Sequence, residues 1–166
     1  MQSSPHLSAG ASAPRRPPAV LWAALALAMA TLAESQTNFY WDRQGNSFNG
    51  TWDTSSANWN TNSGGQTGKE TFVSGGNAIF SAGTSATGSY WIMVSGTQNV
   101  SGIVVEEGNA ILNGGTINFS DATPTLVVNS GATLTWGLTN LTSATNTVNI
   151  GGDGIVNLAA SGAFDG

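Results

Sequence analysis

Cysteine is absent from the sequence, and histidine occurs once, at His6. His6 falls in an N-terminal stretch that we expect to be removed, so the remaining chain has no Ser-His-Asp or Cys-His arrangement and none of the usual zinc ligands. The one pair of adjacent carboxylates, Glu106 and Glu107, directly precedes Gly108. Adjacent strand residues face opposite sides, so we interpret this pair as part of a polar turn. We predict no catalytic residue, no metal site, no cofactor and no enzymatic activity.

Basic residues are also scarce, with four Lys and Arg against nine Asp and Glu. Two of the four, Arg15 and Arg16, lie in the same N-terminal stretch, and without residues 1–33 the chain keeps two basic residues, nine carboxylates and a net charge of −7. Such a surface repels nucleic acid and anionic lipid, which excludes both as partners. The absence of cysteine excludes disulfides, so an exported chain must be stabilised by packing and hydrogen bonds.

Residues 1–33 have the pattern of a secretory signal peptide. An arginine pair precedes the apolar run Ala19–Leu32, and small residues at 28–30 or 31–33 provide a cleavage site. The apolar run is short for a membrane span, although an uncleaved anchor is the alternative. We therefore expect the mature chain to be exported.

Three segments of similar pattern follow in the second half of the chain, at residues 102–113, 125–136 and 147–158. Their starts are 23 and 22 residues apart, and repetition at such a period is typical of stacked repeats. Each segment has an apolar β-type run, a turn rich in Gly, Asn or acidic residues, and a second apolar run. The alignment superposes three sets of positions: Ile103, Leu126 and Val148; Val105, Val128 and Ile150; and Ile111, Leu134 and Val156.

Apolar and polar residues alternate within each run, as in half-buried strands. Turn glycines at Gly108, Gly131 and Gly151-Gly152 provide positions where positive φ is easily adopted. We predict an all-β, right-handed parallel β-helix with 22–23-residue coils over residues 77–166, the last coil being incomplete. An antiparallel β-sandwich is the alternative, because short strands with regular Gly turns fit that fold as well.

Further strands are predicted outside the aligned runs. Residues 77–80 and 90–94 are expected to lead into the coils, and residues 116–119 are expected to add a third strand to the first of them. The corresponding segment of the next coil, residues 139–142, has a weaker strand pattern.

Residues 34–76 form a tryptophan-rich head. Trp41, Trp52 and Trp59 are spaced by 11 and 7 residues, and Asp42 and Asp53 each follow a tryptophan directly. The first coil of a solenoid would expose apolar edges, so these rings are interpreted as an N-terminal cap. The alternative is a carbohydrate-binding site formed by these five residues, with indole faces stacked on sugar rings and carboxylates bonded to hydroxyls.

Several segments of the head and the coils together resemble bacterial exported proteins with autotransporter-associated β-strand repeats. The segments that carry the resemblance are Trp52-Asp53, Asn58-Trp59, Ala78–Thr84, Val94–Gly102 and Gly114-Gly115-Thr116. The resemblance covers roughly residues 38–160 and implies a passenger-type β-solenoid, export from a Gram-negative-type cell, and display at or release from its surface. Association with an outer membrane would need a segment that is not present here.

The expected function is that of a non-enzymatic surface protein, a β-solenoid segment acting in adhesion or display. A carbohydrate-binding module that uses the head is the alternative. The expected partner is an extracellular glycan or protein, and the open last coil predicts end-to-end self-association.

Overall fold

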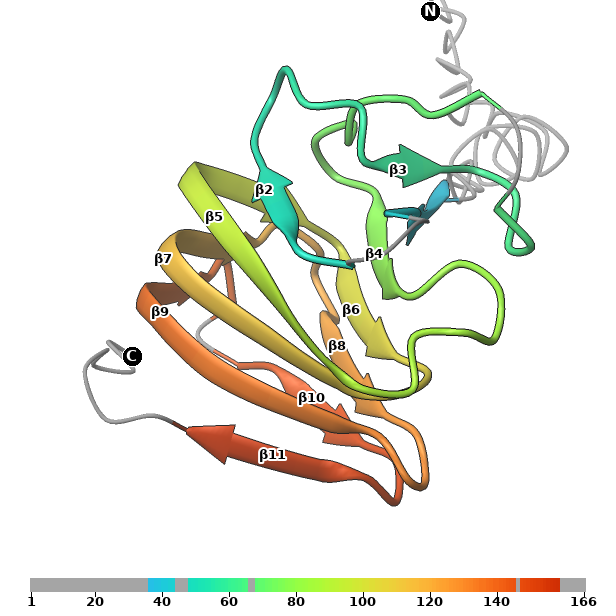
Figure 1. Cartoon of the computed structure of the whole chain (residues 1–166). Helices are drawn as coiled ribbons and strands as arrows, with labels where there is room; N and C mark the ends of the chain where they lie inside the picture. The colour runs from blue at the N-terminus through green and yellow to red at the C-terminus, as the bar shows by residue number, and fades with distance from the viewer. Residues whose placement is uncertain (1–35, 44–47, 66–67, 146, 159–166) are drawn as a thin grey trace, which may run out of the picture. The chain divides into compact units, whose positions relative to one another are not determined.

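The computed structural model describes residues 36–43, 48–65, 68–145 and 147–158. They form two β-sheets and, in these ranges, contain no helix (Figure 1). Sheet A has the order β10-β8-β6-β4-β1-β3, and sheet B has the order β11-β9-β7-β5-β2. The strands are β1 Asn38–Trp41, β2 Gly50–Trp52, β3 Trp59–Asn60, β4 Asn77–Phe80, β5 Ser89–Val100, β6 Gly102–Val105, β7 Asn109–Phe119, β8 Thr125–Val128, β9 Thr133–Ser143, β10 Asn149–Gly151 and β11 Ile155–Leu158.

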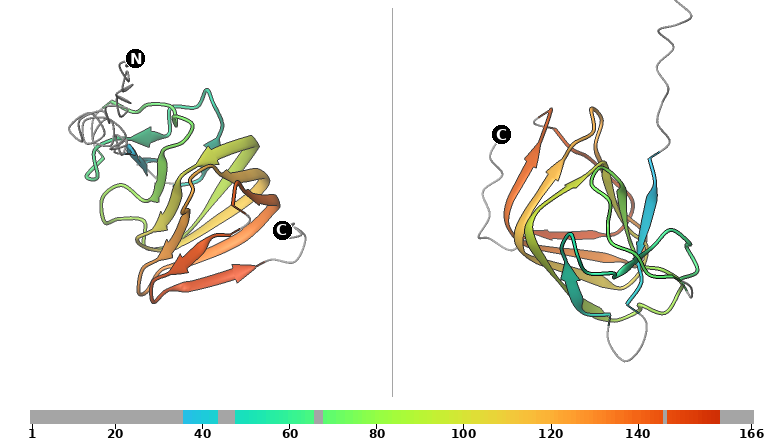
Figure 2. Two further views of the ribbon diagram at one scale, coloured as in Figure 1. Left: turned by 180° about the vertical axis from the view of Figure 1, so that it is seen from behind. Right: turned by 90° about the horizontal axis from the view of Figure 1, so that it is seen from above.

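The chain alternates between the two sheets and returns to each sheet one coil later. Consequently β4, β6, β8 and β10 pair in parallel in sheet A, while β5, β7, β9 and β11 pair in parallel in sheet B. The long strands β5, β7 and β9 lie side by side as curved bands (Figure 2). Parallel pairing of successive coils confirms the β-solenoid, and the antiparallel sandwich alternative is wrong.

In sheet A the predicted alignment is right for one step and wrong for the next. Ile103 lies opposite Leu126, as predicted. Leu126, however, lies opposite Ile150 and not opposite Val148. Leu126 and Ile150 are 24 residues apart, against 23 for the preceding step, because the turn between β8 and β9 has four residues where the turn between β6 and β7 has three. The predicted step of 22 residues is therefore wrong here, and the predicted pairing of Val128 with Ile150 is wrong for the same reason.

In sheet B the alignment slips by one residue. Leu134 lies opposite Val156 as predicted, but its partner in the preceding coil is Ala110 and not Ile111. Ala110 is fully buried, whereas Ile111 is half-buried on the opposite face. Because side chains alternate along a strand, a one-residue slip exchanges the two faces, and the larger aliphatic residue here lies outside.

Strand β7 continues without interruption through the predicted strand at residues 116–119. The weaker segment at residues 139–142 pairs with it inside β9, so both predictions are confirmed. The register between β5 and β7 shifts between Val94 and Thr97, where β5 has one extra residue. Such a bulge bends the strand, and each long strand of sheet B therefore has a bend partway along its length.

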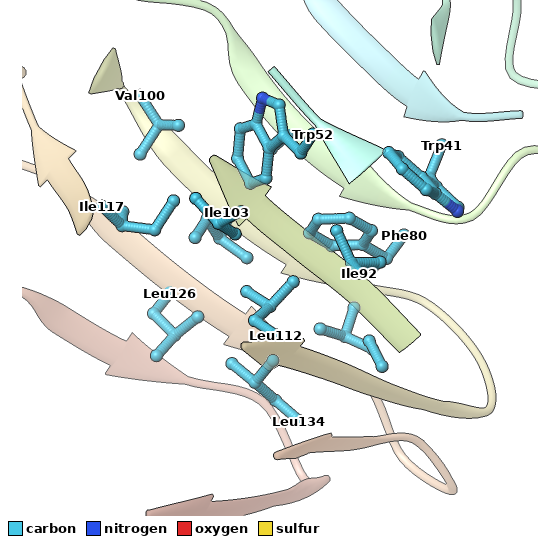
Figure 3. Packing of buried hydrophobic residues seen from close by; sticks show 14 of the residues in the cluster. Trp41, Trp52, Phe80, Ile92, Val100, Ile103, Leu112, Ile117, Leu126 and Leu134 are labelled. Carbon is cyan, nitrogen blue, oxygen red and sulfur yellow. The ribbon is translucent and has the colours of Figure 1, made fainter. Parts of the chain in front are cut away.

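The core lies between the two sheets and is filled by the inward residues of successive coils (Figure 3). From sheet B, Ile92, Leu112 and Trp136 are buried and lie one above another in neighbouring coils. From sheet A, Ile103 and Leu126 face them. Full burial of one such side chain contributes about 1.5–3 kcal/mol, so the contacts between coils hold the column together.

The head is not a separate unit but the first coil of the same column. Strand β1 extends sheet A by parallel pairing with β4, and β2 extends sheet B by parallel pairing with β5. Strand β3 then pairs antiparallel with β1 at the end of sheet A. The boundary predicted at residue 76 therefore falls within a continuous pair of sheets. The predicted signal peptide at residues 1–33, and residues 159–166 of the predicted last coil, lie outside the described residues.

Two turn glycines adopt positive φ, 67° at Gly108 and 82° at Gly131. A Cβ on Gly108 would lie 1.9 Å from the carbonyl oxygen of Ala86, whereas a Cβ on Gly131 would meet nothing within 4 Å. Gly108 is therefore required both by its φ and by the close approach of the preceding coil.

Alanine substitution at these two glycines separates the two requirements. We expect Gly131→Ala to lower the free energy of unfolding by about 1–2 kcal/mol, the cost of a left-handed non-glycine residue. Gly108→Ala should lower the free energy of unfolding by clearly more, because the added Cβ also forces two neighbouring coils apart. Urea unfolding of both variants measures the difference, and equal losses would contradict the close approach at Gly108.

Candidate functional site

The three tryptophans predicted as a cap or as sugar-binding residues are all buried. Trp41, Trp52 and Trp59 are each 0% exposed. The ring of Trp59 packs on both other rings, with centroids 5.1 Å from Trp41 and 4.9 Å from Trp52. Phe72 and Phe80 complete the cluster, both within 6 Å of Trp52. The edge-to-face geometry of these contacts stabilises aromatic packing beyond the area it buries.

Stacking on a sugar ring needs an open aromatic face, and none of these three indoles offers one. Their cluster lies over Ile92 and the first inward residues of the column (Figure 3). The burial supports the cap interpretation. It leaves the head without an exposed ring from this set for a carbohydrate.

The two aspartates of the head are held by the chain itself. Asp42 is 1% exposed, and its Oδ2 accepts a hydrogen bond of 3.1 Å from the Nδ2 of Asn60. Asp53 is half-buried, and its Oδ1 accepts hydrogen bonds from the backbone N–H groups of Ser55 and Ser56. These bonds hold the pKa of the Asp53 carboxyl below its usual range, since they stabilise the charged form. Asp53 thus fixes a turn of the head, and Asp42 joins the segment after β1 to β3.

The glutamate pair has the turn role predicted for it. The Oε1 of Glu107 accepts hydrogen bonds of 3.0 Å from the Ser81 hydroxyl and 3.1 Å from the Ala86 N–H. Burial raises the pKa of the Glu106 carboxyl, and the negative charge of the neighbouring Glu107 adds a smaller increase. Among the described residues no cluster of three or more His, Cys, Asp and Glu side chains could hold a metal ion. That part of the chain also has no helix long and apolar enough to cross a membrane.

The exposed aromatic residue lies elsewhere, on the outer face of sheet B, the face turned away from the core. Trp91 is 57% exposed and Met93 is 54% exposed, while Tyr90, Ile92 and Val94 between and beside them are buried. Sequence reasoning predicted this strand but did not single out Trp91. The alternation of the strand contains the signal, because Trp91 occupies the position opposite to its buried neighbours.

The outer face of sheet B carries no charge. The five strands that form it contain no Asp, Glu, Lys, Arg or His. Their outward residues are mainly Ser, Thr and Asn, and the charged residues of the described chain lie in loops, turns and connections.

Side-chain hydrogen bonds join neighbouring coils across this face. Asn109 donates to the Ser89 hydroxyl over 3.2 Å and accepts from the Thr135 hydroxyl over 3.1 Å. A second ladder joins Asn99, Asn118 and Thr142, with both bonds at 2.8 Å. These ladders fix the outward side chains in place, so the face is a regular polar surface with two exposed apolar places, one around Trp91 and one at Ile155 of β11, which is 58% exposed.

Comparison with known proteins gives one informative similarity. The chain is 30% identical over 169 residues to the adhesin BmaC autotransporter of Brucella suis biovar 1 (strain 1330), which covers 93% of this chain. The chain fits a passenger-type autotransporter β-solenoid. The passenger-type resemblance inferred from the sequence is thereby confirmed. The aligned part spans about 5% of the length of that curated relative. No protein-family model matches the chain, and no solved structure matches it.

Replacing one buried and one exposed tryptophan tests the cap directly. Trp52→Ala should lower the free energy of unfolding by about 3–5 kcal/mol, the usual cost of truncating a buried Trp. Trp91→Ala should change it by less than about 0.5 kcal/mol, as is usual at the surface. Chemical denaturation followed by far-UV circular dichroism measures both values. A stable Trp52→Ala variant would show that the aromatic cluster does not close the column.

Proposed function

We propose that the chain is a non-enzymatic, exported surface module that uses its β-solenoid for adhesion or display. The similarity to an autotransporter adhesin over 93% of the chain carries this proposal. The regular column supports it, because stacked coils present a long, fixed surface without needing a large globular core. The same similarity and the signal peptide predicted at residues 1–33 support the exported state.

The outer face of sheet B is the surface proposed to contact the partner. It combines an absence of charge with side chains fixed by hydrogen-bonded ladders. A pre-ordered surface loses little side-chain entropy on binding, which favours contact with a repetitive partner such as an extracellular matrix.

Adhesion of the whole chain to cells tests the proposed function. Fluorescent beads coated with the chain should bind cultured epithelial cells or their deposited matrix more than albumin-coated beads do. Beads coated with chain that has been heat-unfolded provide the matched control for composition. Binding no greater than that of either control would contradict an adhesive role.

The other partner proposed is a second copy of the chain, through the column end formed by β10 and β11. Ile150 and Leu158 occupy inward positions opposite Leu126 and Trp136, yet they are 65% and 55% exposed. Exposed edge strands with apolar side chains favour pairing with another chain. At the opposite end of the column, the antiparallel β3 and the buried tryptophans do not offer a parallel strand edge for β10 and β11 to pair with. We therefore propose that two copies associate through the β10 and β11 end of each.

Light scattering tests this association. The chain should dimerise with increasing concentration, and Leu158→Lys should shift it toward monomer by placing a charge in the contact. Val73→Lys is the matched control, because Val73 is similarly exposed, at 57%, in a connection away from the column end. A wild-type chain that stays monomeric at millimolar concentration would contradict the proposal.

A further inference from the structure

Trp91 exposes a large aromatic surface at a place where the fold does not need it. It lies in β5 between Tyr90, which is 1% exposed, and Ile92, which is 0% exposed. These neighbours supply the core contacts of the strand, whereas the indole of Trp91 lies on the outer face. Large exposed apolar side chains that are grouped together, rather than scattered, are typical of binding surfaces.

The strand register shows which residues surround the indole. Ile111 lies opposite Trp91 in the next coil, and Met93 lies two residues along the same strand. We call these three residues the Trp91 patch. Polar residues border it: Asn109 and Asn113 flank Ile111 on the same face of β7, and Thr51 of β2 lies opposite Met93.

The border of the patch is held in position. The amide of Asn109 is fixed by its bonds to Ser89 and Thr135. The backbone N–H of Trp91 donates a hydrogen bond of 2.7 Å to the Oδ1 of Asn49, just before β2 begins. The strand therefore stays anchored beside the patch, and the flat surface around the indole is formed before any ligand arrives.

We propose that the Trp91 patch binds a neutral glycan by stacking a sugar ring on the indole, a proposal that rests on the proposed surface function. A sugar ring has an apolar C–H face and a rim of hydroxyls. The indole and Met93 match the apolar face, while the amides of Asn109 and Asn113 can donate to and accept from hydroxyls. Because coils are about 4.8 Å apart and alternate residues about 6.8 Å apart along a strand, the patch matches one or two sugar units.

The absence of charged residues from the strands of sheet B indicates which class of ligand the patch can bind. No residue in the five strands of sheet B is charged, so the face has no cation to pair with a phosphate, sulfate or uronate. Arg43 lies outside these strands, and its guanidinium donates hydrogen bonds to the backbone oxygen of Asn49 and to the side chain of Asn58. A protein partner would insert its anchor residues into a packed pocket, whereas an indole on an open strand face suits a flat ring.

A binding experiment with the full chain tests the patch. The background substitution Trp22→Phe is made in every protein, so that the remaining tryptophans are those of the described residues. Tryptophan fluorescence is titrated with neutral malto-, cello- and laminari-oligosaccharides, and with polygalacturonate and heparin as acidic probes. At least one neutral series should give a saturable change, because Trp91 is the exposed indole among the described tryptophans.

Variants then locate the binding. Calorimetry, which does not depend on an indole, should show at least a tenfold weaker affinity for Trp91→Ala, a loss of about 1.4 kcal/mol. Trp91→Phe should recover part of the affinity, because it keeps an aromatic face. Val73→Ala, at a site with the same exposed fraction, should bind as the wild type does.

Three results would overturn the inference: no saturable change with any neutral series, unchanged affinity of Trp91→Ala, or binding of the acidic probes alone. Bead adhesion measured on the same proteins separates this from the proposed function. If wild-type beads adhere but no neutral oligosaccharide binds, the patch is not a glycan site although the adhesive role stands. If wild-type beads do not adhere, the proposed function fails, and the oligosaccharide titration still decides the chemistry of the patch.

Discussion

The stacking of coils in parallel register is the constraint on which the rest of this structure depends. A short strand such as Gly102–Val105 has backbone groups on both edges, and each edge needs a neighbouring strand or water. Within the column both edges are paired, by β4 on one side and β8 on the other. Every coil therefore depends on the coil before it and the coil after it to pair its backbone groups. At an end of the column one of these neighbours is missing, so the sequence there must differ from that of the inner coils.

The tryptophan-rich head meets this requirement at the N-terminal end. It continues both sheets by one coil and closes the end of the core with Trp52, which lies opposite Val94, and its aromatic neighbours. Strand β3 then pairs with β1 in the opposite direction, which removes the parallel edge that another coil would use. The tryptophans that suggest carbohydrate binding in the sequence are thus used for packing, while Asp42 bonds to Asn60 of β3 and Asp53 fixes a turn.

The surface follows from the same constraint. Parallel in-register coils bring side chains of successive repeats within bonding distance, so Asn, Ser and Thr form ladders where charged residues of one sign would repel. This explains why sheet B is free of charge while the chain as a whole is acidic. Trp91 is the exposed aromatic side chain among the described residues of this mainly polar face.

The fold class, the repeated coils and the strand positions could be predicted from alternation, turn glycines and period. The register could not, because turns of unequal length, such as the four residues between β8 and β9 against three between β6 and β7, shift the alignment without changing the local pattern. Ile111 shows the same limit, since a period alone cannot tell which of two adjacent apolar residues faces the core. The sugar-binding candidates were chosen by residue type alone. Whether a ring is available to a sugar depends on its burial, and burial depends on tertiary contacts between residues far apart in the sequence, such as Trp52 and Phe72.

Introduced cysteines test most directly whether the head is the first coil of the column, because the chain has no cysteine of its own. The Nδ2 of Asn77 lies 3.0 Å from the Oδ1 of Asn38, and the Nδ2 of Asn118 lies 2.8 Å from the Oδ1 of Asn99. Both Asn38→Cys/Asn77→Cys and Asn99→Cys/Asn118→Cys should form an intramolecular disulfide under mild oxidation, while Asn38→Cys/Asn118→Cys should stay reduced. If the second pair oxidises and the first does not, the head does not stack on the column as described here.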